Sequence, residues 1–165
     1  MQTRLCLQVE LGAGLGLLSC TAALLGAKEV FCTDGDGATL RMAQANADLL
    51  QLSHPGARNT IRVRRLKWGE GQEGSLGAAL PVDVVVASDV LYVLDNPGAW
   101  GAFLRTLLAL CSPATVVLLL KVRQGGAWFA HYIDEHATGF QVAGSEGTSA
   151  PPFPVVVQGF GLHLC

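Results

Sequence analysis

The chain has 165 residues, of which half are hydrophobic and 15% are charged, and its formal net charge is −2 at pH 7. This length and apolarity suit one folded domain with a real core and exclude an intrinsically disordered protein. Its charge balance also argues against the basic surface that nucleic-acid-binding proteins use. We expect a monomeric single domain over residues 1–165, with a core at 5–122 and a C-terminal helix and strand pair at 125–165.

Cysteines and histidines are scattered along the chain. The five cysteines are odd in number, far apart and without a C-x-x-C pair, which favours free thiols in a reducing compartment over disulfides. His131 and His136 do not have the i,i+4 spacing that places two metal ligands on one helix face. No apolar stretch is long enough to cross a bilayer. We expect a cytoplasmic protein, with the nucleus as a second location, that has no metal site and no membrane partner.

The first half of the chain alternates short apolar runs with segments of helical period. Strands are predicted at 5–11, 29–33 and 60–66, and helices at 17–27 and 38–51. Gly26 is the expected terminator of the first helix. The buried face of the second helix would be a stripe of alanines and leucines, namely Leu40, Ala43, Ala47 and Leu50.

A basic cluster runs from Arg62 to Lys67 and alternates with apolar residues. Such alternation is typical of a strand with one solvated face, and a patch that binds phosphate groups is the alternative. We interpret the cluster as a strand.

The second half of the chain continues the alternation. A connection rich in Gly and Glu at 69–81 leads to a strand at 82–88 that is nearly all apolar, as expected for a strand buried on both faces of a parallel sheet. Helical spacing assigns Trp100 and Phe103 to the core face of a helix at 97–111. The remaining predicted elements are a strand at 114–122, a helix at 125–137, and final strands at 139–144 and 155–164.

Strands and helices in this order predict an α/β fold with a doubly wound, Rossmann-like and mostly parallel sheet. Parallel strands need crossover connections of one hand, which here are the helices. Ligands bind such sheets beyond the carboxyl ends of the strands, near the point where the strand order reverses. Functional residues should therefore follow the first, second and fourth strands.

Three glycines, Gly12, Gly14 and Gly16, lie directly after the first predicted strand and behind Glu10. The nicotinamide-binding pattern G-x-G-x-x-G does not fit in either register, because Leu17 or Ser19 stands where the third glycine belongs. The pattern present is acidic-x-G-x-G-x-G. A tight strand-to-helix turn without a ligand is the structural alternative.

This pattern resembles the first motif of the class I, seven-strand S-adenosylmethionine-dependent methyltransferases. In such a site an acidic residue after the second strand accepts hydrogen bonds from the ribose hydroxyls. Asp34 has that place, with Asp36 as a less favoured substitute, and the alternative is that these aspartates cap the next helix.

Two further stretches extend the resemblance. "LKWG" at 66–69 follows the third strand, and "ASDVLY" at 87–92 closes the fourth. With the glycine motif and "TDGD", they resemble family 16 of the lysine methyltransferases, the group with a D-x-x-Y motif after the fourth strand. The resemblance covers residues 7–122 and implies S-adenosyl-L-methionine as the cofactor and a protein lysine as the methyl acceptor.

The resemblance also implies a role for each residue of the site. Gly12, Ala13 and Gly14 would line the amino-acid end of the cofactor, with Glu10 and Gly16 completing the loop. Asp34 would bind the ribose, and Trp68 would lie beside the adenine or in the wall near it. A plug under the sheet edge is the structural alternative for Trp68. Ala87 and Ser88 would form the floor next to the sulfonium. Asp89 and Tyr92 would face the substrate amine, although a packed aromatic is the alternative for Tyr92.

The chemistry of lysine methylation fits these residue types. The attacking amine must be neutral, yet its reference pKa is about 10.4, so neutralising it near pH 7 costs about 4–5 kcal/mol. A partly dry pocket with a nearby cation lowers that pKa. We expect Asp89 to orient the amine, Tyr92 to add a ring face and a hydroxyl, and water to take the proton.

The sequence departs from the family pattern at its start. Family members have a segment before the glycine motif that helps to cover the cofactor, and we expect this chain to lack it. Such a departure is expected of a truncated or degenerate relative that is weakly active or inactive, and a catalytically silent binding module is therefore an alternative function. Methylation of a histidine or a small molecule is a further alternative, and a nicotinamide oxidoreductase is disfavoured by the glycine spacing.

Overall fold

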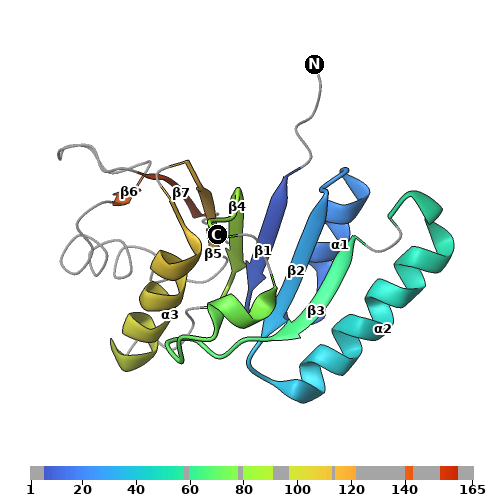
Figure 1. The fold of residues 1–165 in the computed structure, drawn as a ribbon, viewed down its shortest axis with the longest axis horizontal. Coiled ribbons are helices and arrows are strands. Elements are labelled where there is room, and N and C mark those ends of the chain that lie inside the picture. Colours follow the sequence, from blue (N-terminus) through green and yellow to red (C-terminus); the bar gives the residue numbers. More distant parts are fainter. Residues whose placement is uncertain are drawn as a thin grey trace, which may run out of the picture.

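The described residues form a seven-stranded sheet with helices on its two faces (Figure 1). A computed structural model describes residues 6–57, 60–77, 80–90, 97–112, 114–121, 140–142 and 153–159. The strands are β1 (Leu7–Leu11), β2 (Glu29–Asp34), β3 (Ile61–Arg65), β4 (Val84–Ser88), β5 (Val116–Lys121), β6 (Phe140–Val142) and β7 (Phe153–Gly159). The helices are α1 (Leu17–Leu24), α2 (Gly37–Ser53) and α3 (Pro97–Leu110), with short 3-10 turns η1 (Pro55–Ala57) and η2 (Glu73–Leu76).

These elements confirm the predicted strands and helices within the described residues, with small shifts at their ends. Helix α1 ends at Leu24, earlier than predicted, because Gly26 takes a φ of +90° and the chain turns there. The amides of Gly26 and Ala27 then donate to the carbonyls of Ala23 and Ala22, which would otherwise lack partners. The predicted helix at 125–137 lies outside the described residues.

The strand order is β3-β2-β1-β4-β5-β7-β6, and the described pairings are all parallel. The chain steps outward from β1 to β3 and then returns to place β4 on the other side of β1. This arrangement confirms the doubly wound sheet. The order reverses between β1 and β4, so a ligand crevice is expected at their carboxyl ends.

Two apolar clusters hold the helices against the sheet. On one face, Val9 and Leu11 of β1 pack with residues of α3 such as Phe103 and Leu107. On the other face, small residues of α1 and α2 pack on β2 and β3, the group being Ala23, Val30, Cys32, Ala43, Ala47 and Ile61. Side chains alternate along a strand, so Gln8 and Glu10 point away from the first cluster and toward the side of α1.

The arginines of the basic cluster lie in β3, which confirms the strand interpretation for them, whereas Lys67 follows the end of the strand. Strand β3 is an edge of the sheet. Its exposed arginines discourage further strands from pairing there. Arg62 forms an ion pair with Glu29 of the neighbouring strand.

The described cysteines, Cys6, Cys20, Cys32 and Cys111, are free thiols. Burial is the main cause that raises the pKa of Cys32 and Cys111 to about 12, so both stay protonated at neutral pH. Among the described residues, no group of three or more His, Cys, Asp or Glu side chains is arranged to hold a metal ion. Within the same ranges, none of the helices combines the length and apolarity that crossing a membrane requires.

Leu107→Ala should lower the free energy of unfolding by about 2–5 kcal/mol, because the side chain is fully buried and its removal leaves a cavity. Leu49→Ala is the control, since Leu49 is 63% exposed and its loss should change stability by no more than about 0.5 kcal/mol. Urea denaturation of both variants measures the difference. Equal effects would contradict the assignment of α3 to the core.

Candidate functional site

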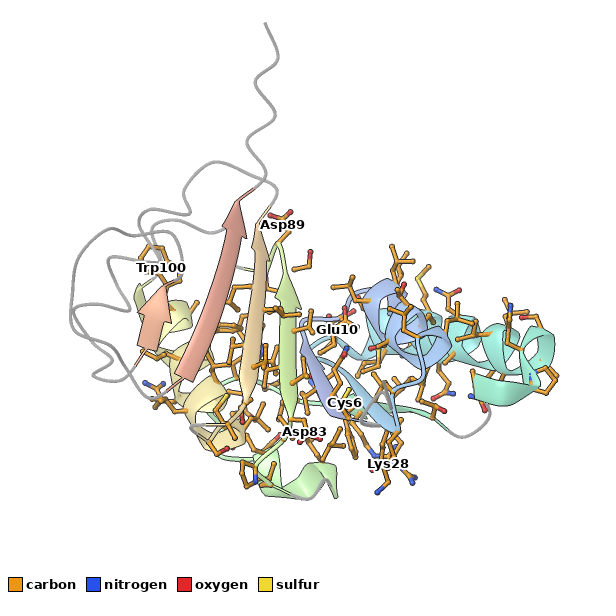
Figure 2. The ribbon with its side chains drawn as sticks, turned by 90° about the horizontal axis from the view of Figure 1, so that it is seen from above. Cys6, Glu10, Lys28, Asp83, Asp89 and Trp100 are labelled. Carbon is orange, nitrogen blue, oxygen red and sulfur yellow. The ribbon has the colours of Figure 1, made fainter. Side chains whose placement is uncertain are left out.

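A pocket of about 670 Å³ lies where β1, β2 and β4 end, within the usual size range of small-molecule sites. Its described lining comes from five stretches of chain: Gly12 and Gly14; Asp34, Gly35, Asp36 and Thr39; Leu66, Lys67 and Trp68; Ser88, Asp89 and Val90; Ala99, Trp100 and Ala102. Figure 2 shows Asp89 and Trp100 at the opposite end of the sheet from Cys6, Lys28 and Asp83.

The glycine loop between β1 and α1 borders this pocket. Gly12, Gly14 and Gly16 have φ values of +68°, +56° and +79°, a region that side chains disfavour. A Cβ on Gly12 would lie 2.6 Å from Val90 Cγ1 and 3.3 Å from Trp68 Cζ2, so no larger residue fits. At Gly14 a Cβ would meet nothing within 4 Å, because this position faces open space.

Hydrogen bonds from β2 and α2 fix the loop in place. The amide of Ala13 donates to the carbonyl of Thr33 at 2.8 Å, and the amide of Gly14 donates to Asp34 Oδ2 at 3.0 Å. Asn46 of α2 donates through Nδ2 to the carbonyl of Leu15 at 2.9 Å. The backbone of the loop is therefore preorganised rather than free to adapt.

Asp34 and Asp36 have different roles. Besides the bond from Gly14, Asp34 accepts the amide of Asp36 at Oδ1, at 2.9 Å, so both of its oxygens are held by backbone. Asp36 is the N-cap of α2 and accepts the amide and the hydroxyl of Thr39 at 2.7 and 2.6 Å. These bonds to Thr39 are the main cause that lowers the pKa of Asp36. Helix capping therefore accounts for Asp36 and not for Asp34.

Trp68 joins the pocket to the core. Its ring meets that of Phe103 edge to face, with centroids 5.0 Å apart and an interplanar angle of 77°. The following residue, Gly69, donates its amide to Thr106 Oγ1 at 2.8 Å, and a Cβ there would lie 2.9 Å from Ala102 Cβ. Trp68 is thus both packed against α3 and part of the pocket wall, so the two alternatives raised for it are compatible.

The end of β4 supplies Ser88, Asp89 and Val90 to the pocket. Asp89 has a φ of +52°, which costs a residue with a Cβ about 1 kcal/mol, although aspartate tolerates this region better than most. The turn places Val90 against Gly12. Tyr92 lies outside the described residues.

Four residues predicted for the cofactor do not line the pocket, namely Glu10, Ala13, Gly16 and Ala87. Ala87 belongs to the core cluster beneath α3, and a Cβ on Gly16 would lie 3.2 Å from Cys32 Sγ. Glu10 is buried behind the loop, where its Oε2 accepts the amide of Ser19 at 2.8 Å and the Ser19 hydroxyl. Burial raises the pKa of Glu10, and the bonds from Ser19 only partly oppose that rise.

Sequence reasoning missed the contribution of α3. Ala99, Trp100 and Ala102 line the pocket, whereas the helical spacing had assigned Trp100 to the core alone. Trp100 is only 6% exposed, so its side chain packs in the core and also borders the pocket. The topology could have indicated this contribution. The helix that follows β4 must begin near the carboxyl ends of the strands, where the pocket lies.

Comparison with known proteins identifies a family that matches most of the chain. A family model described as lysine methyltransferase matches residues 2–135. Protein N-lysine methyltransferase METTL21A of Mus musculus is 35% identical over 119 residues, which cover 72% of this chain and 50% of the mouse protein. The Danio rerio protein of the same name is 37% identical over 111 residues, which cover 67% of this chain and 47% of that protein. The chain spans about half the length of these curated relatives.

Solved structures share the fold. Glycopeptide N-methyltransferase MtfA superposes with a TM-score of 0.57 at 16% identity, covering 76% of this chain and 50% of that one. Precorrin-6y C5,15-methyltransferase from Geobacter metallireducens GS-15 gives a TM-score of 0.55 at 19% identity, covering 79% of this chain and 62% of that one. At such identities the likeness shows the fold alone.

Gly12→Ala should lower the free energy of unfolding by about 2–4 kcal/mol, because it combines an unfavourable φ with a clash against Val90. Gly14→Ala has the same backbone problem without the clash, so its cost should be about 1 kcal/mol. Adding Val90→Ala to Gly12→Ala should restore part of the loss. Urea denaturation would contradict the close approach if both glycine variants lost the same stability.

Glu10→Gln should change how stability depends on pH. Since folding raises the pKa of Glu10 above its usual 4.5, the folded protein binds more protons than the unfolded chain between the two values. The unfolding free energy of the wild type should therefore fall, relative to the variant, as pH rises through that window. Denaturation measured from pH 4 upward tests this, and a relative stability that grows with pH would refute the assignment.

Proposed function

The chain belongs to the lysine methyltransferase family, and we propose that it transfers a methyl group from S-adenosyl-L-methionine to a lysine side chain of a protein. The observation that most supports this function is the Asp34 carboxylate, which lies in the pocket wall and is held at both oxygens by backbone amides. A carboxylate has about four acceptor sites, so two remain for the neighbouring hydroxyls of a ribose.

The described residues fit this cofactor. Gly12 and Gly14 present bare backbone to the pocket, and the space beside Gly14 is open, since a Cβ there would meet nothing within 4 Å. Gly12 and Gly14 would hold the amino-acid end, Asp34 the ribose, and the ring of Trp68 the adenine. When bound, the cofactor supplies a methyl group activated by a positively charged sulfur.

Asp89 is the described residue best suited to orient the acceptor amine. It lies in the pocket wall beside Ser88, at a backbone turn where its φ is +52°. Its negative charge favours the protonated amine, so its contribution is orientation and not proton removal. Proton loss to water, together with partial desolvation in the pocket, would produce the neutral amine that reacts.

We further propose that the partner is a protein acceptor, with no nucleic acid or membrane involved, and that the chain acts as a monomer in the cytoplasm or nucleus. The net charge of −2 supports the exclusion of nucleic acid. Tyr92 remains a proposed contact of the amine.

Asp34→Ala should weaken binding of S-adenosyl-L-methionine about 100-fold, because two hydrogen bonds to a charged acceptor are lost. Asp48→Ala is the matched control, since Asp48 is an exposed carboxylate of α2 that bonds only Gln44 among the described contacts. Titration calorimetry measures both dissociation constants. If Asp34→Ala bound as tightly as the wild type, Asp34 would not be the ribose acceptor.

Asp89→Asn should reduce kcat about 100-fold and leave the dissociation constant of the cofactor within about twofold, because misplacing the amine slows transfer without disturbing the donor. Transfer of a labelled methyl group to lysate proteins, followed by mapping of the modified side chains, measures turnover and acceptor type together. Full turnover in the variant would remove Asp89 from the mechanism. Labelled histidine would favour another acceptor, and binding without transfer would favour a silent module.

A further inference from the structure

Glu10 is a buried carboxylate that the proposed reaction does not use. It is 3% exposed, lies outside the described pocket wall, and points from β1 toward α1 (Figure 2). Its described side-chain contacts are with Ser19, a fully buried residue in the first turn of α1, through the amide at 2.8 Å and the hydroxyl. Burying a charge in this way is costly, and the bonds from Ser19 offset part of that cost.

Helix α1 needs an acceptor at its first turn that its own N-cap cannot provide. The first amides of a helix have no partner within it, and a Ser, Thr, Asp or Asn at the N-cap usually accepts one of them. The N-cap here is Gly16, which has no side chain. Serine or aspartate would be strained there, because φ is +79° and a Cβ would lie 3.2 Å from Cys32 Sγ.

We propose that Glu10 is a positioning residue that replaces the missing cap and so holds the glycine loop in its binding conformation; its effect on the cofactor rests on the proposed function. The loop at 12–16 is then fixed from both neighbouring strands. Asp34 of β2 holds Gly14 in the middle of the loop, and Glu10 of β1 holds Ser19 beyond its end. The contact with Ser19 therefore explains why the motif has an acidic residue at the end of β1, at a set number of residues before α1.

Three substitutions of Glu10 distinguish the effect of its hydrogen bonds to Ser19 from the effect of its charge. Glu10→Gln keeps an acceptor oxygen at the same reach and removes the charge. Glu10→Asp keeps the charge and shortens the side chain by one methylene, so it cannot reach Ser19 without a shift of the backbone. Glu10→Ala removes both. Thr115→Val is the control for lost stability, because it breaks a buried bond from Thr115 Oγ1 to the Val82 carbonyl without contacting the loop.

The first measurement is amide hydrogen exchange of the ligand-free full chain, followed residue by residue. In Glu10→Ala and Glu10→Asp, exchange at Ser19 should accelerate at least tenfold more than at core amides such as Phe103. Glu10→Gln and Thr115→Val should show no such local excess. Unchanged relative protection of Ser19 in the alanine and aspartate variants would overturn the proposal.

The second measurement compares binding of S-adenosyl-L-methionine with that of its uncharged-sulfur product, S-adenosyl-L-homocysteine. If the loop loses its conformation in Glu10→Ala, the affinity for both compounds should fall about tenfold. Glu10→Gln should retain most of the affinity. Weakening of the cationic donor alone, or a glutamine variant as weak as the alanine variant, would instead assign Glu10 a direct charge effect and refute positioning. If the wild type bound neither compound, the proposed function would fail, while hydrogen exchange would still decide the role of Glu10.

Discussion

The bond between the Asp34 carboxylate and the amide of Gly14 is the contact on which the site depends. It joins the end of β2 to the loop that follows β1, and the parallel pairing of these strands brings the two within reach. The second oxygen of Asp34 accepts the Asp36 amide, so the carboxylate cannot swing away. One side chain therefore fixes the loop and presents the remaining acceptor sites to the pocket.

Close packing of side chains restricts the glycine loop on its other side. Val90 and Trp68 occupy the volume that a side chain on Gly12 would need, and Trp68 rests on Phe103 of the core. The pocket is thus bounded by five separate stretches of sequence, and its shape depends on the packing of α3. Backbone strain is present here as well, at Asp89, a residue with a Cβ that has a φ of +52°. Strain that persists at one edge of a sheet is typical of a functional site.

The sequence predicted the fold well because period and order are local properties: alternating apolar runs and a glycine directly after a strand are visible without a structure. It also predicted that Gly12, Gly14, Asp34, Trp68, Ser88 and Asp89 would gather, and these six residues do line one pocket. It could not distinguish Glu10 from the residues that line the pocket. Glu10 belongs to the same motif but points behind the loop, and the direction of a side chain depends on strand pairing and helix docking. Trp100 was missed for the related reason that a buried aromatic can border core and pocket at once.

Titration of the labelled full chain with S-adenosyl-L-methionine, followed by amide NMR, tests most directly whether this loop and its carboxylate form the cofactor site. The largest shifts should occur at the amides of Gly12, Gly14 and Asp36, while Lys28 and Asp83, at the far end of the sheet, should not move (Figure 2). Spectra that stay unchanged at millimolar cofactor, or that change only at the far end, would contradict a methyl-donor site at the glycine loop.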